Sequence, residues 1–288
     1  MKQTVLITGG SSFIAKHLIK ILDGKYNIKL LTRNPKADNE FQWNLEDWTI
    51  DEKALDDVNY IVHLSGSKLN DGSPLTTERK KIVYDSRIGA ANFLREKLKT
   101  RHQRLEAFVS ASAIGYYGFT DSTMEINENG ERGRGFNADL SDDWEQAADQ
   151  FKTDDVANHV SKIRVSLVLG GDGGIFPMYL NMIKTDPQIA NKPNPGSYPW
   201  NHVEDMAGIF AFAVENNLDG VYNSVSPQPA SMQDVFKATA NEIANTNYKL
   251  SVFQGQHLVS HKIISKGYVF KYPNIEKAIH NIVAALKP

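Results

Sequence analysis

The chain has 288 residues, of which 41% are apolar and 23% charged, values typical of a globular protein long enough for a sizeable core. Its formal net charge of -2 gives no electrostatic basis for binding nucleic acid or an anionic membrane surface. It contains no cysteine, which excludes disulfides, thiolate metal sites and a cysteine nucleophile.

A strand pattern begins directly after residue 3. A signal peptide would instead begin with a charged segment and an apolar core, so the sequence does not predict one. No apolar run reaches the length of a membrane span, so we expect a cytoplasmic protein. The predicted strands are residues 5–8, 28–32, 41–44, 60–65, 107–112 and 160–169, and the predicted helices are residues 14–22, 51–55, 76–98 and a helix opening near residue 142. This alternation predicts a doubly wound, parallel α/β sheet of the Rossmann-like kind.

The pattern loosens after residue 170. The elements predicted there are a short helix at 176–184, a proline-rich surface loop at 186–199, helices at 204–216 and 231–244, a strand at 221–223, and a closing helix with an apolar stripe between residues 275 and 286. We therefore predict a dinucleotide-binding core over residues 1–170. Residues 171–288 are expected to return helices and strands to that core and to form a small C-terminal α/β substrate lobe.

A turn rich in glycine and serine joins the first predicted strand to the first predicted helix. Its sequence is Gly9-Gly10-Ser11-Ser12. Backbone N–H groups at such a turn, together with the helix dipole, favour the pyrophosphate of a dinucleotide. Ser12 takes the place of the glycine that usually lets the backbone approach the pyrophosphate. Nucleotide binding is our interpretation, and the alternative is an ordinary strand–helix turn in which Ser11 or Ser12 caps the helix.

Three later strands end in residues that suit a ligand, at the edge where such sheets bind one. Arg33 follows the second strand, where an acidic residue would grip ribose hydroxyls and an Arg suits the 2′-phosphate of NADP. Leu64, Ser65 and Gly66 end the fourth strand and leave room for a cofactor. Residues 110–118 offer hydroxyls and tyrosines for polarising a carbonyl or carbinol group. The structural alternatives are a solvated Arg, a simple strand exit and aromatic packing.

Several blocks spread along the chain form a recognisable combination. They are Ile7-Thr8-Gly9-Gly10, Ser110-Ala111-Ser112-Ala113-Ile114-Gly115-Tyr116-Tyr117-Gly118, Asp143-Trp144-Glu145 with Ala148, Leu167-Val168-Leu169-Gly170, Trp200-Asn201-His202-Val203-Glu204-Asp205, Gly220-Val221-Tyr222-Asn223 with Pro227, and Gly267-Tyr268-Val269-Phe270-Lys271-Tyr272-Pro273. With these blocks the chain resembles the extended short-chain dehydrogenase/reductases, the group of NAD-dependent epimerases and dehydratases. More narrowly, it is similar to the atypical epimerase-family proteins of unknown substrate. The resemblance spans nearly the whole chain.

The resemblance implies roles for individual residues. The implied cofactor contacts are Gly9, Ser11, Ser12, Phe13 and Ile14 at the pyrophosphate turn, Arg33 at the 2′-phosphate, Asn44 near adenine, and Leu64, Ser65, Gly66 and Ser110 at the strand ends. Ser112 matches the active-site serine. The wider family also uses a Tyr-x-x-x-Lys pair, in which the Tyr is the acid/base and the Lys lowers its pKa and binds ribose. Trp144 and Ala148 stand in those two places and supply neither function.

Two tyrosines are the first candidates to replace the missing acid/base. Tyr116 and Tyr117 follow Ser112 closely, and either is predicted to reach the nicotinamide face. Glu145 is a further candidate, although with Asp142 it is spaced as a helix capping box.

Trp200 and His202 are predicted substrate contacts. His202 with Asp205 has the residue types of a base and its partner, and the structural alternative is a strand–helix junction. Other chemistries lack their motifs, since there is no Gly-x-Ser-x-Gly elbow, no His-Glu-x-x-His helix and no phosphate loop for nucleoside triphosphates. The eight histidines show no ligand spacing, so we expect no metal.

The sequence and the resemblance together predict an NADP-dependent oxidoreductase or epimerase-like protein, with NAD less favoured, acting on an unidentified small polar substrate. The alternative is a non-catalytic NADP(H)-binding sensor or partner-binding module. A third interpretation is a protein that has the fold but has lost cofactor binding as well. We expect neither nucleic acid nor membrane as a partner, and a homodimer is compatible with the sequence.

Overall fold

The computed structural model describes residues 2–69, 72, 74–118, 125–193, 196–244, 246–250 and 257–286. The elements up to residue 153 are β1 (Thr4–Thr8), α1 (Phe13–Leu22), β2 (Asn27–Thr32), β3 (Glu40–Asn44), β4 (Thr49–Ile50), η1 (Glu52–Leu55), β5 (Val58–His63), α2 (Thr77–Tyr84), η2 (Asp85–Gly89), α3 (Ala90–Thr100), β6 (Leu105–Ala113), η3 (Ile114–Tyr117), β7 (Glu125–Ile126) and α4 (Phe136–Thr153). The later elements are β8 (Ala157–Val165), β9 (Leu167–Gly170), β10 (Gly173–Gly174), α5 (Phe176–Thr185), η4 (Pro187–Asn191), β11 (Trp200–His202), α6 (Val203–Glu215), β12 (Gly220–Ser224), α7 (Met232–Ala244), β13 (His257–Leu258), α8 (His261–Ser265) and α9 (Ile275–Ala284).

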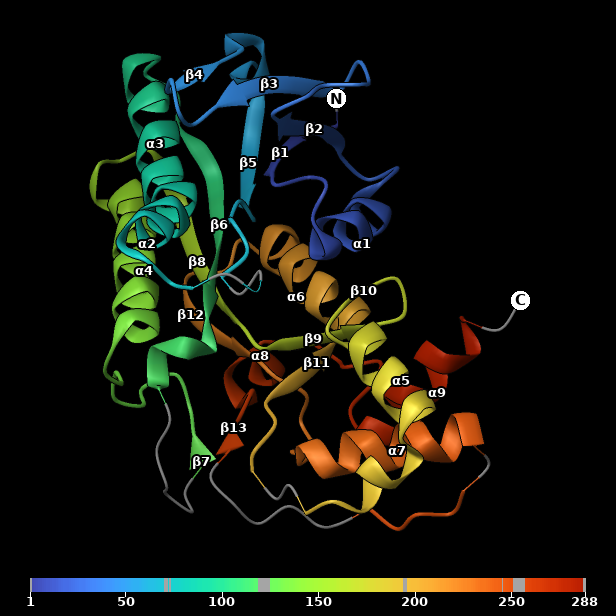
Figure 1. Ribbon diagram of the computed structural model, residues 1–288. Coiled ribbons are helices and arrows are strands. Elements are labelled where there is room, and N and C mark those ends of the chain that lie inside the picture. The colour runs from blue at the N-terminus through green and yellow to red at the C-terminus, as the bar shows by residue number, and fades with distance from the viewer. Residues whose placement is uncertain are drawn as a thin grey trace. The chain divides into compact units, whose positions relative to one another are not determined.

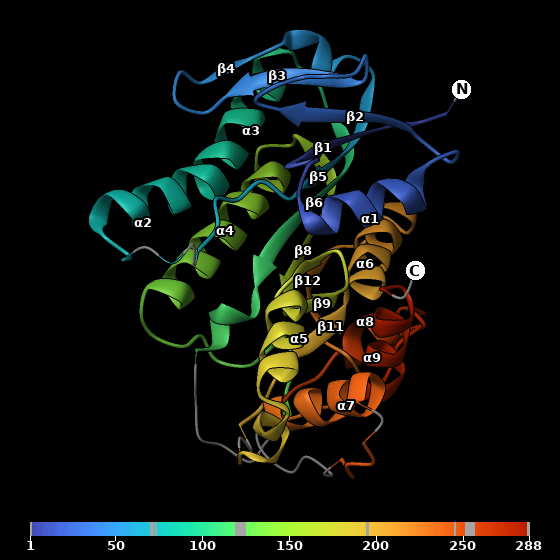
Figure 2. The same cartoon turned by 45° about the vertical axis from the view of Figure 1, so that its right-hand side comes forward.

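Eight strands form one sheet in the order β12-β8-β6-β5-β1-β2-β3-β4. Strand β1 pairs in parallel with β2 and β5, β5 pairs in parallel with β6, and β2 pairs in parallel with β3, whereas β4 is an antiparallel edge strand. Helices α2, α3 and α4 lie on one face of these strands and α1 lies on the other (Figures 1 and 2). The predicted doubly wound, mainly parallel α/β fold is confirmed. Within the described ranges, no helix has the length and apolar character needed to cross a membrane.

The core follows from the apolar runs that predicted the strands. Leu6 and Ile7 of β1 have no exposed surface. Helix α1 buries Ala15, Leu18 and Leu22, which recur at helical spacing and so share one face. Because a parallel strand with helices on both faces has no solvated side, its residues read as a continuous apolar run.

The long helix predicted over residues 76–98 is two helices joined by the π turn η2. Gly89 ends this turn, and a Cβ there would lie 2.7 Å from the indole of Trp48. The predicted helical stretch is confirmed, whereas its π turn was not predicted, because apolar spacing alone does not reveal one extra residue in a helical turn. Arg79 in α2 and Arg87 in η2 both hydrogen-bond to Ser67, in the segment after β5.

Helix α4 begins at Phe136 and not near Asp142 as the sequence predicted. Gly135, with a φ of 90°, precedes it, and the buried stripe of the helix extends back to Ala138. The predicted capping box of Asp142 and Glu145 is wrong, because Glu145 lies inside the helix, where backbone N–H groups are already bonded.

The strand predicted over residues 160–169 is divided between two sheets. Strand β8 ends at Val165, and β9 pairs instead with β10 and β11 in a three-stranded sheet. Ser166 separates them and donates its hydroxyl to the Ser224 carbonyl oxygen at 2.6 Å. The predicted surface loop at 186–199 is also partly wrong, since it contains η4 and buries Ala190 and Tyr198.

The residues group into two compact units. Unit 1 comprises Met1–Gly118, Arg132–Ile163 and Phe210–Val221, and unit 2 comprises Phe119–Glu131, Arg164–Ile209 and Tyr222–Pro288. Unit 2 has its own apolar core, in which residues of α5, α7 and α9 pack with the buried Trp200 of β11.

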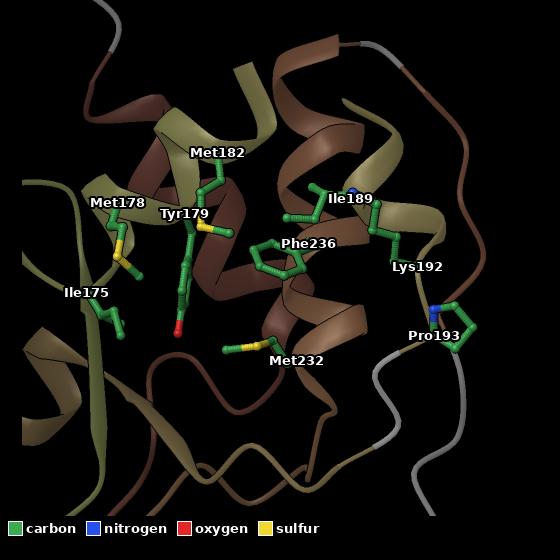
Figure 3. Close-up of a pocket in the computed structure, with 9 residues that line it drawn as sticks. All are labelled: Ile175, Met178, Tyr179, Met182, Ile189, Lys192, Pro193, Met232 and Phe236. Carbon is green, nitrogen blue, oxygen red and sulfur yellow. The ribbon is translucent and has the colours of Figure 1, made fainter. Parts of the chain in front are cut away.

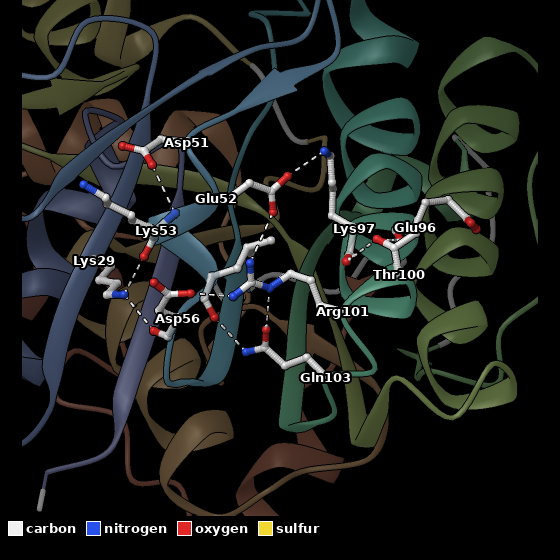
Figure 4. Close-up of polar contacts among 11 residues, drawn as sticks. Lys29, Asp51, Glu52, Lys53, Asp56, Glu96, Lys97, Thr100, Arg101 and Gln103 are labelled. Carbon is white, nitrogen blue, oxygen red and sulfur yellow. Dashed lines mark hydrogen bonds and ion pairs between the residues drawn. The ribbon is translucent and has the colours of Figure 1, made fainter.

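Polar contacts in unit 1 fix the segment that leads into β5 (Figure 4). Arg101 after α3 donates to the carboxylates of Glu52 and Asp56. The Gln103 amide donates to the Leu55 and Val58 carbonyl oxygens at 2.8 and 3.3 Å. The exposed ion pairs contribute little to stability, whereas the Gln103 bonds satisfy backbone groups where β5 begins.

Candidate functional site

The glycine turn lies between β1 and α1 and is closed by backbone contacts. Gly9 has a φ of +66°, and a Cβ there would lie 2.7 Å from the Leu64 carbonyl oxygen. Only glycine fits, because a side chain would be strained and would collide with the end of β5. The Ser12 N–H donates to the Gly9 carbonyl oxygen at 2.8 Å.

Ser12 is the N-cap of α1, as the structural alternative predicted. Its hydroxyl oxygen accepts a hydrogen bond from the Ala15 N–H at 3.3 Å. The N–H groups of Phe13 and Ile14 donate to no partner within the described ranges, so they are available to an anion. Ser12 therefore occupies one donor of the helix terminus and leaves others. Ser11 is exposed beside it.

Thr8 joins the ends of β1 and β5. Its Oγ1 accepts the N–H groups of Leu64 and Ser65 at 3.0 and 2.9 Å, which uses both lone pairs. The Thr8 hydroxyl must then donate to His63 Nδ1 at 3.0 Å, while His63 Nε2 bonds to the Arg87 carbonyl oxygen at 3.0 Å. A carbonyl only accepts, so this network fixes a neutral His63 with its proton on Nε2. Burial lowers the pKa of His63 to about 4, with the Arg87 charge acting in the same direction.

The adenine end predicted for the cofactor contains Arg33 and Asn44. Arg33 is exposed directly after β2, and its guanidinium contacts no carboxylate in the described part of the chain. The Asn44 side chain is used locally, since its amide donates to Asp47 at 2.7 Å and its oxygen accepts the Glu46 N–H at 2.9 Å. Asn44 thus stabilises the turn after β3.

Ser110 and Ser112 lie on β6, which packs against α4. Both are buried, and the Ser110 hydroxyl donates to the Ala111 carbonyl oxygen at 2.8 Å. The Ser112 hydroxyl donates to a Glu145 carboxylate oxygen at 2.7 Å. Glu145 is only 7% exposed, and a carboxylate that deep needs such donors. The structure therefore brings a hydroxyl and a buried carboxylate together at the predicted active-site serine.

Trp144 lies one residue before Glu145 on α4. It is 6% exposed, its ring meets the His63 ring edge-on at 6.4 Å, and the Arg87 guanidinium carbon lies 5.1 Å from its ring centroid. Ala148 is fully buried on the same helix. An indole and a methyl group have no titratable proton, so neither Trp144 nor Ala148 can act as an acid or base. Glu145 is the carboxylate of this helix that contacts Ser112.

Tyr116 and Tyr117 form the short helix η3 after β6. Their rings meet edge-on at 5.4 Å, and Tyr117 is buried whereas Tyr116 is half-buried. The Gly133 N–H donates to the Tyr116 carbonyl oxygen at 2.8 Å, and a Cβ on Gly133 would lie 2.4 Å from the Tyr117 carbonyl oxygen. Packing and backbone contacts thus account for the two residues, with Tyr116 the more accessible.

Trp200 and His202 belong to unit 2, on β11. Both are buried, and the Trp200 side chain is part of the core of that unit. His202 Nδ1 accepts the Glu204 N–H at 3.1 Å, and the His202 ring lies 3.8 Å from that of Tyr272. These contacts match the strand–helix junction named as the alternative for His202.

Asp205 serves the segment at residues 268–272. Its carboxylate accepts the Tyr268 hydroxyl at 3.0 Å and the N–H groups of Lys271 and Tyr272, each at 2.8 Å. Burial raises the pKa of Asp205, and these hydrogen bonds oppose that rise. Asp205 is therefore engaged as a structural tie between α6 and that segment.

Unit 2 also contains an apolar pocket of about 420 Å³ (Figure 3). Met178, Met182 and Phe236 contribute to its wall, and Lys192 supplies a cation that already pairs with Asp186 at 2.9 Å. It contains none of the predicted site residues and offers an apolar wall instead of polar recognition.

Sequence reasoning missed the roles of His63 and Arg87. His63 interrupts an apolar strand with a titratable side chain, and Arg87 interrupts a helical pattern near a glycine. These signals were present in the sequence, but neither says that the His63 ring and the Arg87 guanidinium both lie beside Trp144.

Comparisons with known proteins agree with this architecture. No family model matches the chain. An epimerase family protein of Staphylococcus epidermidis is 25% identical and aligns over 97% of this chain and 99% of its own. The human epimerase family protein SDR39U1, in a crystal structure with NADPH, covers 98% of this chain and 99% of its own, with a TM-score of 0.76 and 22% identity. UDP-glucose 4-epimerase of Thermus thermophilus, in complex with NAD, covers 98% of both chains, with a TM-score of 0.74 and 17% identity. The first similarity confirms the resemblance to epimerase family proteins, and the two structures confirm the fold.

Proposed function

We propose that this relative of the epimerase family proteins binds a nicotinamide dinucleotide at the carboxyl ends of β1, β2 and β5 and carries out NADP-linked oxidoreductase or epimerase chemistry on a small polar substrate. The observation that carries the proposal is the turn at Gly9, where the backbone approaches Leu64 and the N–H groups of Phe13 and Ile14 point out of the helix terminus. The human relative solved with NADPH and the Thermus enzyme solved with NAD support a cofactor of this class.

A preference for NADP rests on Arg33. In this type of fold, the residue after the second strand selects the cofactor, through a carboxylate on the ribose hydroxyls or a guanidinium on the 2′-phosphate. Arg33 is exposed there and has no carboxylate partner within the described ranges. Its planar fork suits a phosphate group.

The chemistry rests on Ser112 and Glu145. The Ser112 hydroxyl gives its proton to the hydrogen bond with Glu145, so its lone pairs are left to accept the proton of a substrate hydroxyl. A proton leaving that substrate would pass to Ser112 Oγ while the Ser112 proton passes to the carboxylate. When bound, the nicotinamide would supply hydride transfer. Glu145 thus takes over the proton-accepting part of the absent tyrosine.

A cofactor-binding protein without turnover is the second candidate. Trp144 and Ala148 at the positions of the family's Tyr and Lys favour it, because neither side chain moves a proton or binds ribose. Such a protein would sense NADP(H) or serve a partner.

Titration with NADPH and NADH, followed by cofactor fluorescence, tests the binding step. We expect NADPH to bind more tightly than NADH, and absence of binding by both at millimolar concentration would overturn the proposal. Hydride transfer is then measured between NADPH and a panel of aldehydes, ketones and reducing sugars. Turnover identifies the enzyme, and binding with no transfer across the panel identifies the sensor.

A further inference from the structure

Two side chains of unit 1, Trp144 and Arg87, have N–H groups without an acceptor among the described residues. The first is the indole N–H of Trp144, whose nitrogen is buried and has no partner within the described residues. Leaving such a donor unpaired in the interior is unfavourable, because the hydrogen bond that it would make to water is lost. A buried polar group that remains unpaired in a folded protein therefore calls for a specific explanation.

The second donor is the guanidinium of Arg87. Its Nη1 is anchored to the Ser67 and Val83 carbonyl oxygens, each at 3.1 Å, and to Ser86 Oγ at 3.4 Å. Its Nε and Nη2 donate to no group in the described part of the chain, and no carboxylate there pairs with it. These two nitrogens form the edge of the guanidinium that binds a carboxylate or phosphate through two parallel hydrogen bonds.

The charged form of Arg87 is disfavoured by its surroundings. Burial, together with the charge of Arg79, lowers the pKa of Arg87 to about 10. The hydrogen bonds that Nη1 donates to Ser67, Val83 and Ser86 hold the guanidinium against this part of the fold. A cation held in this way gains most from an anionic partner, because the low local dielectric strengthens the attraction.

Gly66 provides the space in which the guanidinium lies. A Cβ on Gly66 would lie 2.9 Å from the guanidinium carbon of Arg87 and 3.0 Å from Nη2. The guanidinium also lies near Trp144, with its central carbon 5.1 Å from the indole centroid. The glycine at the end of β5 therefore admits the guanidinium next to the strand-end backbone, at the edge of the sheet where ligands bind.

We propose that the Nε and Nη2 edge of Arg87 and the indole N–H of Trp144 together bind an oxyanion, the carboxylate or phosphate group of this protein's substrate. The assignment of that group to the substrate rests on the proposed function, whereas the binding itself requires neither cofactor nor turnover. The substrate class is thereby narrowed to small polar molecules that carry an anionic oxygen group.

The test follows the tryptophan indole signals of ¹⁵N-labelled protein by NMR during addition of sodium phosphate or sodium acetate, with sodium chloride at matched ionic strength. The chain has four tryptophans, and Trp144→Phe assigns the signal of interest. We expect that signal to move and to saturate with phosphate, with acetate, or with both. The Trp200 indole nitrogen is also buried without a partner within the described ranges, yet no guanidinium contact accompanies it, so its signal is the internal control.

Two conservative variants make the result specific. Arg87→Lys keeps a positive charge but loses the paired donors, and we expect it to weaken anion binding at least about tenfold. Arg95→Lys is the matched control, because Arg95 already pairs with Asp154 at 3.2 Å, and it should leave binding unchanged. An unchanged Trp200 signal shows that each variant is folded.

Saturation with phosphate alone identifies a phosphoryl-bearing substrate, and saturation with acetate identifies a carboxylate. The inference is overturned if neither anion moves the Trp144 signal at tens of millimolar, or if Arg87→Lys binds as well as the parent chain. Anion binding in a protein that binds no NADPH or NADH would sustain this inference and reject the proposed function. NADPH binding without an anion response would do the reverse.

Discussion

Acidification is expected to destabilise the protein through His63. The unfolded chain binds a proton at His63 with the ordinary pKa of 6.5, whereas burial, together with the Arg87 charge and against the hydrogen bond to the Arg87 carbonyl, lowers the folded pKa to about 4. Between these two values the unfolded state binds more protons, so the free energy of unfolding falls as the pH falls from about 6.5 to about 4. At about 1.4 kcal/mol for each pH unit, the full loss is about 3 kcal/mol. Above pH 6.5 His63 contributes no pH dependence.

Urea unfolding of the parent chain and of His63→Gln, measured at intervals from pH 7 to pH 4, isolates this contribution. The glutamine amide still donates toward the Arg87 carbonyl oxygen but does not titrate, so the difference between the two chains should shrink by about 3 kcal/mol as the pH falls. A difference that stays constant over this range would refute the reasoning. So would an NMR titration in which His63 protonates near pH 6.5, or imidazole nitrogen shifts that place the proton of neutral His63 on Nδ1 instead of Nε2.

Three substitutions test the cofactor and proton-transfer sites. Gly9→Ala should lower the free energy of unfolding by about 2 kcal/mol or more beyond Gly24→Ala and should abolish NADPH binding. Gly24→Ala is the control, because Gly24 also has a positive φ but a Cβ there meets nothing within 4 Å. Equal losses of unfolding free energy in the two variants would contradict the close approach of Gly9 to Leu64. Arg33→Ser should weaken NADPH at least about tenfold in fluorescence titration and leave NADH unchanged, and a parallel loss of both would remove Arg33 from the phosphate contact. Glu145→Gln keeps an acceptor for the Ser112 hydroxyl but takes up no proton, so hydride transfer should fall about 100-fold or more while NADPH binding stays within about twofold. Full turnover by that variant would exclude the relay.

The parallel sheet could be predicted because each strand is an apolar run and each helix has an apolar stripe. Both signals are local. The start of α4 could not be predicted in this way, since residues 136–141 alternate apolar and polar side chains and show no helical spacing. Once α4 is extended to Phe136, Glu145 changes from a capping residue into the partner of Ser112.

The candidate site was predicted in part for a similar reason. Gly9 and Ser12 lie in a turn whose structure depends on a few adjacent residues. The role of Ser12 as a helix cap could therefore be predicted as an alternative from those residues alone. His63, Arg87 and Trp144 are separated along the chain and meet only because β5, η2 and α4 are neighbours in the fold. No spacing rule within one sequence expresses such a meeting.

The π turn η2 contains one residue more than a regular helical turn, and this residue sets the rotation of α2 relative to α3. Each residue of an α-helix advances the rotation by about 100°, so deleting one residue between Asp85 and Gly89 would restore a regular helix and turn α2 by that amount relative to α3. Arg79 would then leave Ser67, and the carbonyl of Arg87 would no longer be offered to His63. Deletion of Ile88, whose side chain makes none of the strand-end contacts, would thus dismantle those contacts while keeping every side chain that makes them. Such a variant separates the effect of their placement from the effect of their chemistry.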